Sequence, residues 1–323
     1  MSGKLNVYLT EPIMPEAQEL LAANSDLDVG HAEIPPDELL ARVAKADAIL
    51  SKTDMITISA EVIAAAPKLR LIARHGSGFN NVDVEAANRR GIVVTYTPGA
   101  HAVTIAEYTV GLMLSSCRRL PAAVAATKLG HPDRLSFMGM EVFGKTFGVV
   151  GVGSIGREVV SRVHALGMRV LAYHPRPSAS RLGDLPLELV DLDTLLRESD
   201  VVSVHVPLAE ETVDLIGEPQ LALMKHSAHL LNLARGGIVN EPAVRKALVS
   251  GRLAGYATDV TVQEPIPADD PLLSTPNAII LPHIAAVTKE AQTRVAMAAV
   301  GEVLRFSKGE PLHCVLNKEV LER

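Results

Sequence analysis

The chain has 323 residues, of which 48% are hydrophobic and only 3% aromatic, and its formal net charge at pH 7 is −6. This length exceeds the size at which one hydrophobic core stops growing, so we expect two domains with aliphatic cores. The acidic balance and the scattered basic residues give no reason to expect a nucleic-acid partner. The two cysteines, Cys117 and Cys314, exclude a disulfide framework and a cysteine metal cluster, and their apolar surroundings predict buried, reduced thiols.

The N-terminal stretch predicts a strand, not a targeting signal. Residues 4–9 read Lys-Leu-Asn-Val-Tyr-Leu, without the long apolar region of a signal peptide. The longest apolar region, from Thr104 to Cys117, is interrupted by Glu107 and is too short to span a bilayer. We therefore expect a cytoplasmic protein without a membrane partner.

The first hundred residues alternate short aliphatic runs with amphipathic segments. The runs predict strands at residues 5–9, 48–50, 69–73 and 92–95. Helical patterns fall between them, at residues 15–23, 36–45, 60–66 and 84–89. Alternating strands and helices predict a parallel sheet covered by helices, which is the α/β class.

A break at Pro98 and Gly99 precedes residues 102–117, which carry apolar residues at helical spacing on nearly every face. Such a helix is expected to be buried between domains or subunits. Residues 120–141 contain Pro121, Pro132 and Gly139 and are predicted to form an irregular connection.

The second half of the chain predicts a complete dinucleotide-binding fold. Six further aliphatic runs predict strands at residues 147–150, 169–173, 201–205, 229–233, 255–260 and 278–281, and six parallel strands are the number of that fold. A last amphipathic helix at residues 290–305 is placed against the first sheet. The predicted architecture is a Rossmann domain at residues 100–288, inserted into a discontinuous, flavodoxin-like substrate domain formed by residues 1–99 and 289–323.

The apolar run that begins at Phe147 breaks into a Gly-x-Gly-x-x-Gly pattern and then resumes as a helix. Gly151 is expected to make the turn, Gly153 to let a pyrophosphate approach the backbone, and Gly156 to bring the helix close to the strand. The anion would rest on unpaired N–H groups at the helix N-terminus. The same pattern also occurs in plain turns, so other residues must support the assignment.

Polar residues gather where the strands of the second domain end. Ligands of open parallel sheets bind at that edge, and three of these residues, Arg235, Glu264 and His283, suit the reduction of a 2-oxo acid. His283 as imidazolium would give a proton to the carbonyl oxygen while a nicotinamide delivers hydride to the carbon. Glu264 would raise the pKa of the imidazole, and Arg235 could present a planar fork to the substrate carboxylate. Each residue alone could be structural, but their joint placement favours catalysis.

Several motifs resemble the D-isomer-specific 2-hydroxyacid dehydrogenase family. They are residues 151–156, 205–208, 232–239, 259–260 followed by 264–265, and 282–283. Within the family, the chain is similar to the branch of phosphoglycerate dehydrogenases and hydroxypyruvate or glyoxylate reductases, through residues 81–83, 137–139 and 144–146.

This resemblance implies a catalytic set, a cofactor site and a substrate site. Arg235, Glu264 and His283 would carry the reaction, and Asp259 would face the nicotinamide. Main-chain groups of Ser77 and Gly78 would receive the substrate carboxylate. The enzyme would form a homodimer through its coenzyme domains. Further cofactor contacts are expected at Gly151, Gly153, Ser154, Ile155, Gly156, His205, Val206, Pro207, Thr212 and Ala234.

The end of the second strand departs from the pattern of NAD enzymes, in which an acidic residue usually binds the ribose 2′-hydroxyl. Here His174 follows the strand, with Arg176 and Ser178 close behind. These side chains can donate hydrogen bonds to a 2′-phosphate, and Arg176 adds positive charge. We therefore predict a preference for NADPH over NADH; the alternative is a loop that accepts both.

The predicted substrate is a small polar 2-oxo acid such as hydroxypyruvate or glyoxylate. In the phosphoglycerate branch, basic residues of the first domain grip a phosphate, and Lys52 and Arg74 stand at the corresponding places. They leave D-3-phosphoglycerate dehydrogenase as an alternative, unless they are ordinary surface charges. Another alternative is a cofactor-sensing binding protein without activity. No metal site is predicted, because His226 and His229 lack a neighbouring acid or third ligand.

Overall fold

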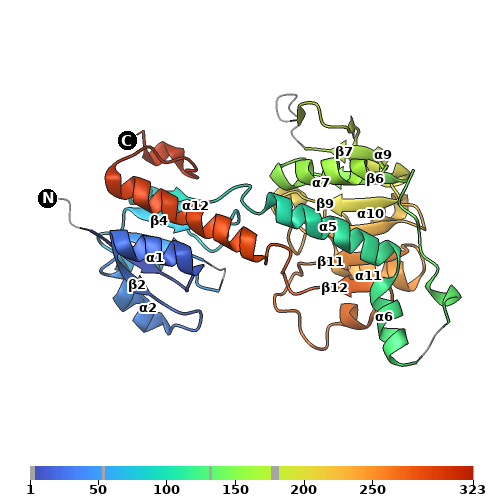
Figure 1. The fold of residues 1–323 in the computed structure, drawn as a ribbon, viewed down its shortest axis with the longest axis horizontal. Helices are drawn as coiled ribbons and strands as arrows, with labels where there is room; N and C mark the ends of the chain where they lie inside the picture. Colours follow the sequence, from blue (N-terminus) through green and yellow to red (C-terminus); the bar gives the residue numbers. More distant parts are fainter. Residues whose placement is uncertain (1–3, 53–54, 131–132, 176–181, 323) are drawn as a thin grey trace. The chain divides into compact units, whose positions relative to one another are not determined.

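The computed structural model describes residues 4–52, 55–130, 133–175 and 182–322. The chain divides into two compact units, one formed by residues 1–101 and 287–323 and the other by residues 102–286 (Figure 1). The chain passes between the units at residues 101/102 and 286/287, whereas the sequence pattern places the boundaries at 99/100 and 288/289. Each unit has its own sheet and its own hydrophobic core.

The first unit contains a five-stranded parallel sheet in the order β2-β1-β3-β4-β5, which is the order of flavodoxin-like sheets. The strands are β1 (Leu5–Leu9), β2 (Ser25–Val29), β3 (Ala48–Ser51), β4 (Leu71–Arg74) and β5 (Val93–Thr95). The strand β2 is absent from the sequence prediction, because Asp26 and Asp28 interrupt its apolar pattern. It lies at the edge of the sheet, where charged side chains are common.

Helices from both ends of the sequence cover this sheet. Those between the strands are α1 (Pro15–Asn24), α2 (Pro36–Val43), α3 (Ala60–Ala65) and α4 (Val84–Arg89). The long helix α12 (Lys289–Lys308) returns to the unit and packs beside α1 and on β3 and β4. Its residues Ala296 and Val300 are fully buried in one core cluster with Val7 of β1. The two ends of the chain therefore build one core.

The second unit contains a seven-stranded parallel sheet in the order β12-β11-β10-β9-β6-β7-β8. Counted from β6, this is the 3-2-1-4-5-6 order of dinucleotide-binding folds with one more strand at the end. The predicted number of six strands is wrong by one, because β8 is only two residues long and exposed. The strands are β6 (Thr146–Val150), β7 (Arg169–Tyr173), β8 (Glu188–Leu189), β9 (Val201–Val204), β10 (His229–Asn232), β11 (Gly255–Thr258) and β12 (Ala278–Ile280).

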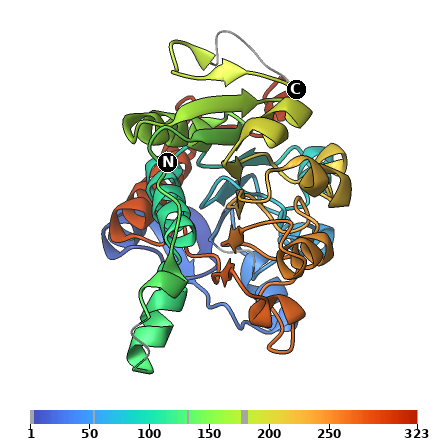
Figure 2. The ribbon, with the colours of Figure 1, turned by 90° about the vertical axis from the view of Figure 1, so that its right-hand side faces the viewer.

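Helices cover both faces of the larger sheet (Figure 2). On one face lie α5 (Ala102–Cys117) and α7 (Ser154–Ala165). On the other lie α9 (Leu192–Glu198), α10 (Glu218–Leu223) and α11 (Glu241–Val249). Val149 packs with the first group and Val150 with the second, because successive side chains of a strand point to opposite faces. Burial on both faces explains the continuous aliphatic runs of the sequence.

The residues after α5 differ from the prediction. The helix α6 (Leu120–Lys128) occupies the first part of a stretch that the sequence pattern predicts to be irregular. Pro121 stands in its first turn, where a missing N–H is tolerated, and helix-favouring alanines follow. None of the residues of α6 is buried. Among the described residues, no helix combines the length and the apolar character needed to cross a membrane.

Candidate active site

The glycine-rich turn joins β6 to α7 at the carboxyl edge of the larger sheet. Gly151 has a φ of +101°, and a Cβ there would stand 2.9 Å from the backbone just after β9. A Cβ on Gly156 would stand 2.2 Å from the Gly151 carbonyl oxygen, so only glycine lets α7 approach so closely. At Gly153, no described atom lies within 4 Å of that position. The first N–H groups of α7, at Ser154 and Ile155, therefore fit a dinucleotide pyrophosphate.

The next strand of the sheet, β7, ends beside this turn. His174 follows it directly and is half-buried. Arg176 and Ser178, which complete the predicted phosphate-binding group, lie outside the described residues. The two described residues directly after β7, His174 and Pro175, thus supply an imidazole and no carboxylate.

The loop after β9 is supported from within by its own side chains. The His205 ring pairs through Nε2 with Ser203 Oγ at 2.9 Å. Burial lowers the pKa of His205 to about 4, so the ring is neutral near pH 7. Thr212 Oγ1 donates to the Pro207 carbonyl at 2.7 Å and accepts from the Ala209 N–H at 2.8 Å. The side chains of His205 and Thr212 therefore hold the loop, and Val206 is 4% exposed and packs in the core. The loop's backbone is left for contact with a cofactor.

Arg235 lies on a tight turn after β10, and hydrogen bonds with the Asn232 side chain hold the backbone of this turn. The Asn232 side chain accepts a hydrogen bond from the Ala234 N–H at 3.1 Å and donates to the Arg235 carbonyl at 2.9 Å. Arg235 Nη1 donates to the Ala234 carbonyl at 2.8 Å. A Cβ on Gly236 would stand 2.1 Å from the Thr261 carbonyl oxygen, so this position requires glycine. The guanidinium is thus carried by a rigid turn.

The carboxylate and the imidazole that the sequence predicts to act together are in contact. Glu264 Oε2 lies 2.7 Å from His283 Nδ1, and 40% of each side chain is exposed. The hydrogen bond and charge of Glu264 raise the pKa of His283, although burial and the charge of Arg235 oppose this. Burial raises the pKa of Glu264, but the hydrogen bond and charge of His283 leave it below its usual value. The contact therefore favours the charged forms of both groups, a carboxylate and an imidazolium, and it leaves the His283 Nε2 unused.

Asp259 holds the backbone around His283. Its Oδ1 accepts a hydrogen bond from the Ile284 N–H at 2.9 Å, and its Oδ2 from the Ala285 N–H at 2.6 Å. The Tyr108 hydroxyl of α5 reaches Oδ1 at 3.5 Å. His283 has a φ of +56°, a left-handed conformation that costs roughly 1–2 kcal/mol in a residue with a side chain. Asp259 is only 1% exposed, so its carboxylate acts on His283 through this turn.

Sequence reasoning assigns no role to Asn232, Tyr108 or Thr261. An amide two residues before a glycine-containing turn is a signal that could have identified Asn232, because such side chains often bond to the backbone two residues on. No pattern marks Tyr108, which lies 151 residues from Asp259 in the sequence.

The residues predicted to bind the substrate carboxylate or a phosphate belong to the first unit. Lys52 follows β3, and its Nζ donates to the Pro12 carbonyl at 2.7 Å. Arg74 ends β4, is 5% exposed, and donates to main-chain carbonyls. Ser77 is exposed and Gly78 half-buried in the loop that follows.

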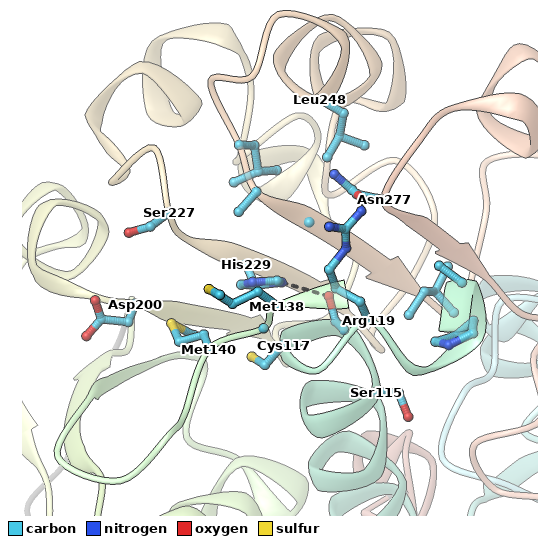
Figure 3. A pocket seen from close by; sticks show the side chains of 18 of the residues that line it. Ser115, Cys117, Arg119, Met138, Met140, Asp200, Ser227, His229, Leu248 and Asn277 are labelled. Carbon is cyan, nitrogen blue, oxygen red and sulfur yellow. Dashed lines mark hydrogen bonds between the residues drawn. The ribbon is translucent and has the colours of Figure 1, made fainter. Parts of the chain in front are cut away.

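A hollow of about 1100 Å³ lies at the opposite edge of the larger sheet, where its strands begin (Figure 3). Ser116 Oγ and His229 Nδ1 pair at 2.8 Å in its wall. Burial lowers the pKa of His229 to about 4, so this imidazole is neutral near pH 7. Among the described residues, no group of three or more His, Cys, Asp or Glu side chains could hold a metal ion. The predicted catalytic residues follow the other ends of the strands, so the hollow is not the candidate active site.

Comparison with known proteins gives matches over nearly the whole chain. A family model described as D-isomer specific 2-hydroxyacid dehydrogenase, NAD binding domain, matches residues 110–285. A D-3-phosphoglycerate dehydrogenase of Archaeoglobus fulgidus is 41% identical over 98% of this chain, which spans 60% of that protein. A glyoxylate reductase of Korarchaeum cryptofilum is 39% identical over 99% of this chain and 98% of that protein. Among solved structures, the TT0316 protein from Thermus thermophilus is 36% identical with a TM-score of 0.89, covering 97% of this chain and 100% of that chain.

Proposed function

Because the chain belongs to the D-isomer specific 2-hydroxyacid dehydrogenase family, we propose that it is a reductase of small, unphosphorylated 2-oxo acids such as hydroxypyruvate and glyoxylate. Family membership makes it an oxidoreductase that acts on a CH–OH group with a nicotinamide cofactor. The observation that carries the proposal is the 2.7 Å contact between His283 Nδ1 and Glu264 Oε2. The positive charge of Arg235 also acts on the His283 ring. A cofactor-sensing protein without activity gives no reason for this charged pair.

The three residues divide the chemistry among them. When bound, the nicotinamide supplies the hydride to C2 of the 2-oxo acid. With His283 Nδ1 tied to Glu264, the Nε2–H of the imidazolium donates the proton to the carbonyl oxygen. In the reverse direction, the same nitrogen accepts the hydroxyl proton. Arg235 offers a planar fork to the substrate carboxylate, and its charge stabilises the negative charge that grows on the carbonyl oxygen.

The proposed cofactor is NADPH in preference to NADH. Residues 174–178 read His-Pro-Arg-Pro-Ser and contain no carboxylate that would repel a 2′-phosphate. His174, Arg176 and Ser178 all carry hydrogen-bond donors. The double variant His174→Asp with Arg176→Ala should lower kcat/KM with NADPH and raise it with NADH. An unchanged ratio of the two kcat/KM values would contradict the assignment.

We further propose a homodimer formed through the second unit, as the family resemblance implies. The helix α6 has nine residues and none is buried, although isolated helices below about 12–15 residues are marginal in water. Large apolar side chains that are exposed together in one segment mark an interaction surface. In the proposed dimer, those around α6 in one copy would pack into the hollow of the other copy. These side chains are between 48% and 76% exposed and belong to Leu120, Val124, Leu129, Leu135, Met138 and Phe143.

Sedimentation equilibrium tests the dimer. The wild-type protein should have twice the mass of one chain, and a variant with Val124→Glu and Leu135→Glu should have the mass of one. A monomeric wild type would contradict the proposal. The cytoplasmic location expected from the sequence stays a prediction.

A substrate panel tests the activity and separates it from its alternatives. Glyoxylate, hydroxypyruvate, phosphohydroxypyruvate and phenylpyruvate are each assayed with NADPH and with NADH. We expect the highest kcat/KM for hydroxypyruvate or glyoxylate with NADPH. A preference for phosphohydroxypyruvate would favour D-3-phosphoglycerate dehydrogenase, the name of the Archaeoglobus relative. Binding of NADPH without oxidation by any of the four acids would favour the cofactor-sensing protein.

A further inference from the structure

We propose that Arg74 is a positioning residue that shapes the carboxylate-binding loop of the first unit, and that it does not bind a substrate phosphate. The inference rests on the proposed function, because it concerns how the same 2-oxo acid is held and why a phosphorylated one is not preferred. Arg74 is the last residue of β4 and is 5% exposed. The loop that follows it, residues 75–79, contains the main-chain groups of Ser77 and Gly78 that are expected to receive the carboxylate.

The guanidinium of Arg74 is engaged by main-chain carbonyls on both sides of this loop. Its Nε donates to the Gly78 carbonyl at 2.9 Å. Its Nη1 lies 3.1 Å from the carbonyls of Ser51 and His75, and it also contacts the Lys52 carbonyl. A planar fork with several fixed donors can span these acceptors at once, whereas the compact ammonium of a lysine cannot. The side chain therefore ties the end of β3 to both ends of the loop.

Hydrogen bonds to the loop's carbonyls, from Arg74 and from Thr97, also set the direction of some of its N–H groups. In a trans peptide, the C=O of one residue and the N–H of the next point in opposite directions. The Gly76 carbonyl accepts a hydrogen bond from the Thr97 N–H at 2.9 Å, which turns the Ser77 N–H away from the strand. The bond from Arg74 fixes the Gly78 carbonyl and, with it, the direction of the N–H of the next residue, Phe79. Within the described residues, the N–H groups of Ser77 and Gly78 have no hydrogen-bond acceptor.

Two neighbouring N–H groups that have no acceptor of their own can form a site for a small anion. A carboxylate fits such a site because two oxygens can accept from adjacent donors. The Arg74 charge lies behind the loop and strengthens its attraction for an anion without touching it. A phosphate would need a cationic side chain that reaches it, whereas Arg74 is 5% exposed and uses its Nε and Nη1 on main-chain carbonyls. Lys52 Nζ already places one of its three donors on the Pro12 carbonyl. Burial lowers the pKa of His75 to about 4, so this ring adds no charge near pH 7.

The test compares Arg74→Lys with Arg90→Lys. Arg90 is a matched control, because its guanidinium also donates to main-chain carbonyls, those of residues 63, 66 and 67, which lie at the end of α3 and not in the loop after β4. Both variants keep the positive charge and lose the planar fork. The KM for hydroxypyruvate and for phosphohydroxypyruvate, the Kd of NADPH and the Tm are measured for each. The Kd of oxalate in the presence of NADPH supplies a readout that does not depend on turnover.

We expect Arg74→Lys to raise both KM values by the same factor, at least tenfold, and to weaken oxalate binding equally. The Kd of NADPH should not change, and Arg90→Lys should lower the Tm without changing either KM. Thr97→Val removes the Oγ1 that accepts a hydrogen bond from the Gly76 N–H at 2.9 Å, and it should also weaken oxalate binding. This variant replaces Arg74→Lys in the test if Arg74→Lys does not fold.

Two results would overturn the inference. One is a rise in KM for phosphohydroxypyruvate alone, which would make Arg74 a phosphate ligand. The other is oxalate binding that neither Arg74→Lys nor Thr97→Val changes, which would separate the loop from the substrate site. A wild type that reduces none of the acids, but whose binding of oxalate is weakened by Arg74→Lys, would defeat the proposed function and leave this inference standing.

Discussion

Replacement of Glu264 by glutamine tests whether the carboxylate keeps the His283 ring charged. Glutamine has nearly the same shape, so Nδ1 keeps a possible partner while the negative charge is lost. A hydrogen bond to a charged group contributes about 1.5–3 kcal/mol, and we take the lower end because 40% of each side chain is exposed. Since about 1.4 kcal/mol is a factor of ten in rate, we expect kcat/KM for hydroxypyruvate reduction to fall roughly tenfold at neutral pH.

The pH dependence makes this test sharper. Glu264 raises the pKa of His283, so its loss lowers that pKa. Reduction needs the imidazolium, and kcat/KM therefore falls as pH rises through the pKa of His283. In Glu264→Gln this fall should begin at a lower pH than in the wild type. Oxidation of the 2-hydroxy acid needs the neutral ring and should lose less at high pH.

The assay is kcat/KM in both directions across the pH range. Glu218→Gln is the control, because it removes a carboxylate that pairs with Lys246 at 2.9 Å and does not touch His283. It should leave both pH profiles unchanged. If Glu264→Gln keeps the wild-type profile, Glu264 does not govern the ring and the acid–base role of the pair is wrong.

Other residues give further tests. Gly236→Ala would place a Cβ 2.1 Å from the Thr261 carbonyl oxygen, so kcat/KM should fall at least 100-fold even where circular dichroism shows a folded protein. Asn232→Ala removes both hydrogen bonds that hold the Arg235 turn and should lower the free energy of unfolding in urea by about 1–3 kcal/mol. His229 has a pKa of about 4 in the folded state against 6.5 in the unfolded chain. The unfolded state thus binds more protons between these values, and lowering the pH through this window should reduce stability by up to about 3 kcal/mol. Urea unfolding of His229→Gln at pH 7 and pH 4.5 should show a smaller loss than the wild type.

The strands in the central parts of both sheets could be predicted from the sequence, because they are buried on both faces and are therefore mostly aliphatic. Residues 5–9 and 169–173 form β1 and β7 with the predicted bounds, and their aliphatic runs have no competing pattern. The edge strands β2 and β8 are missed, because an edge tolerates charges such as Asp26 and Glu188. The helix α6 is missed because Pro121 marks a helix start as well as a break.

In the candidate site too, some features could be predicted from the sequence and others could not. Parallel strands bring their carboxyl ends to one edge, which is why Glu264 and His283 could be placed together from sequence and lie 2.7 Å apart. The supports of these residues could not be predicted, because they depend on backbone direction. The bonds from Asp259 to the turn at His283 are one case. The sequence also shows that Arg74 is positive, but the acceptors that surround it come from two separate segments, the end of β3 and the loop after β4.

The strand β10 has a different neighbour at each end. Its last residue, Asn232, supports the Arg235 turn, and its first residue, His229, lies in the wall of the hollow. At about 3.3 Å per residue, these positions are roughly 10 Å apart along a rigid, fully buried strand. Substitutions or small molecules introduced around the hollow therefore do not touch the Arg235 turn directly. The hollow is therefore a place to tether, fuse or separate copies of this protein without altering a side chain of the candidate active site.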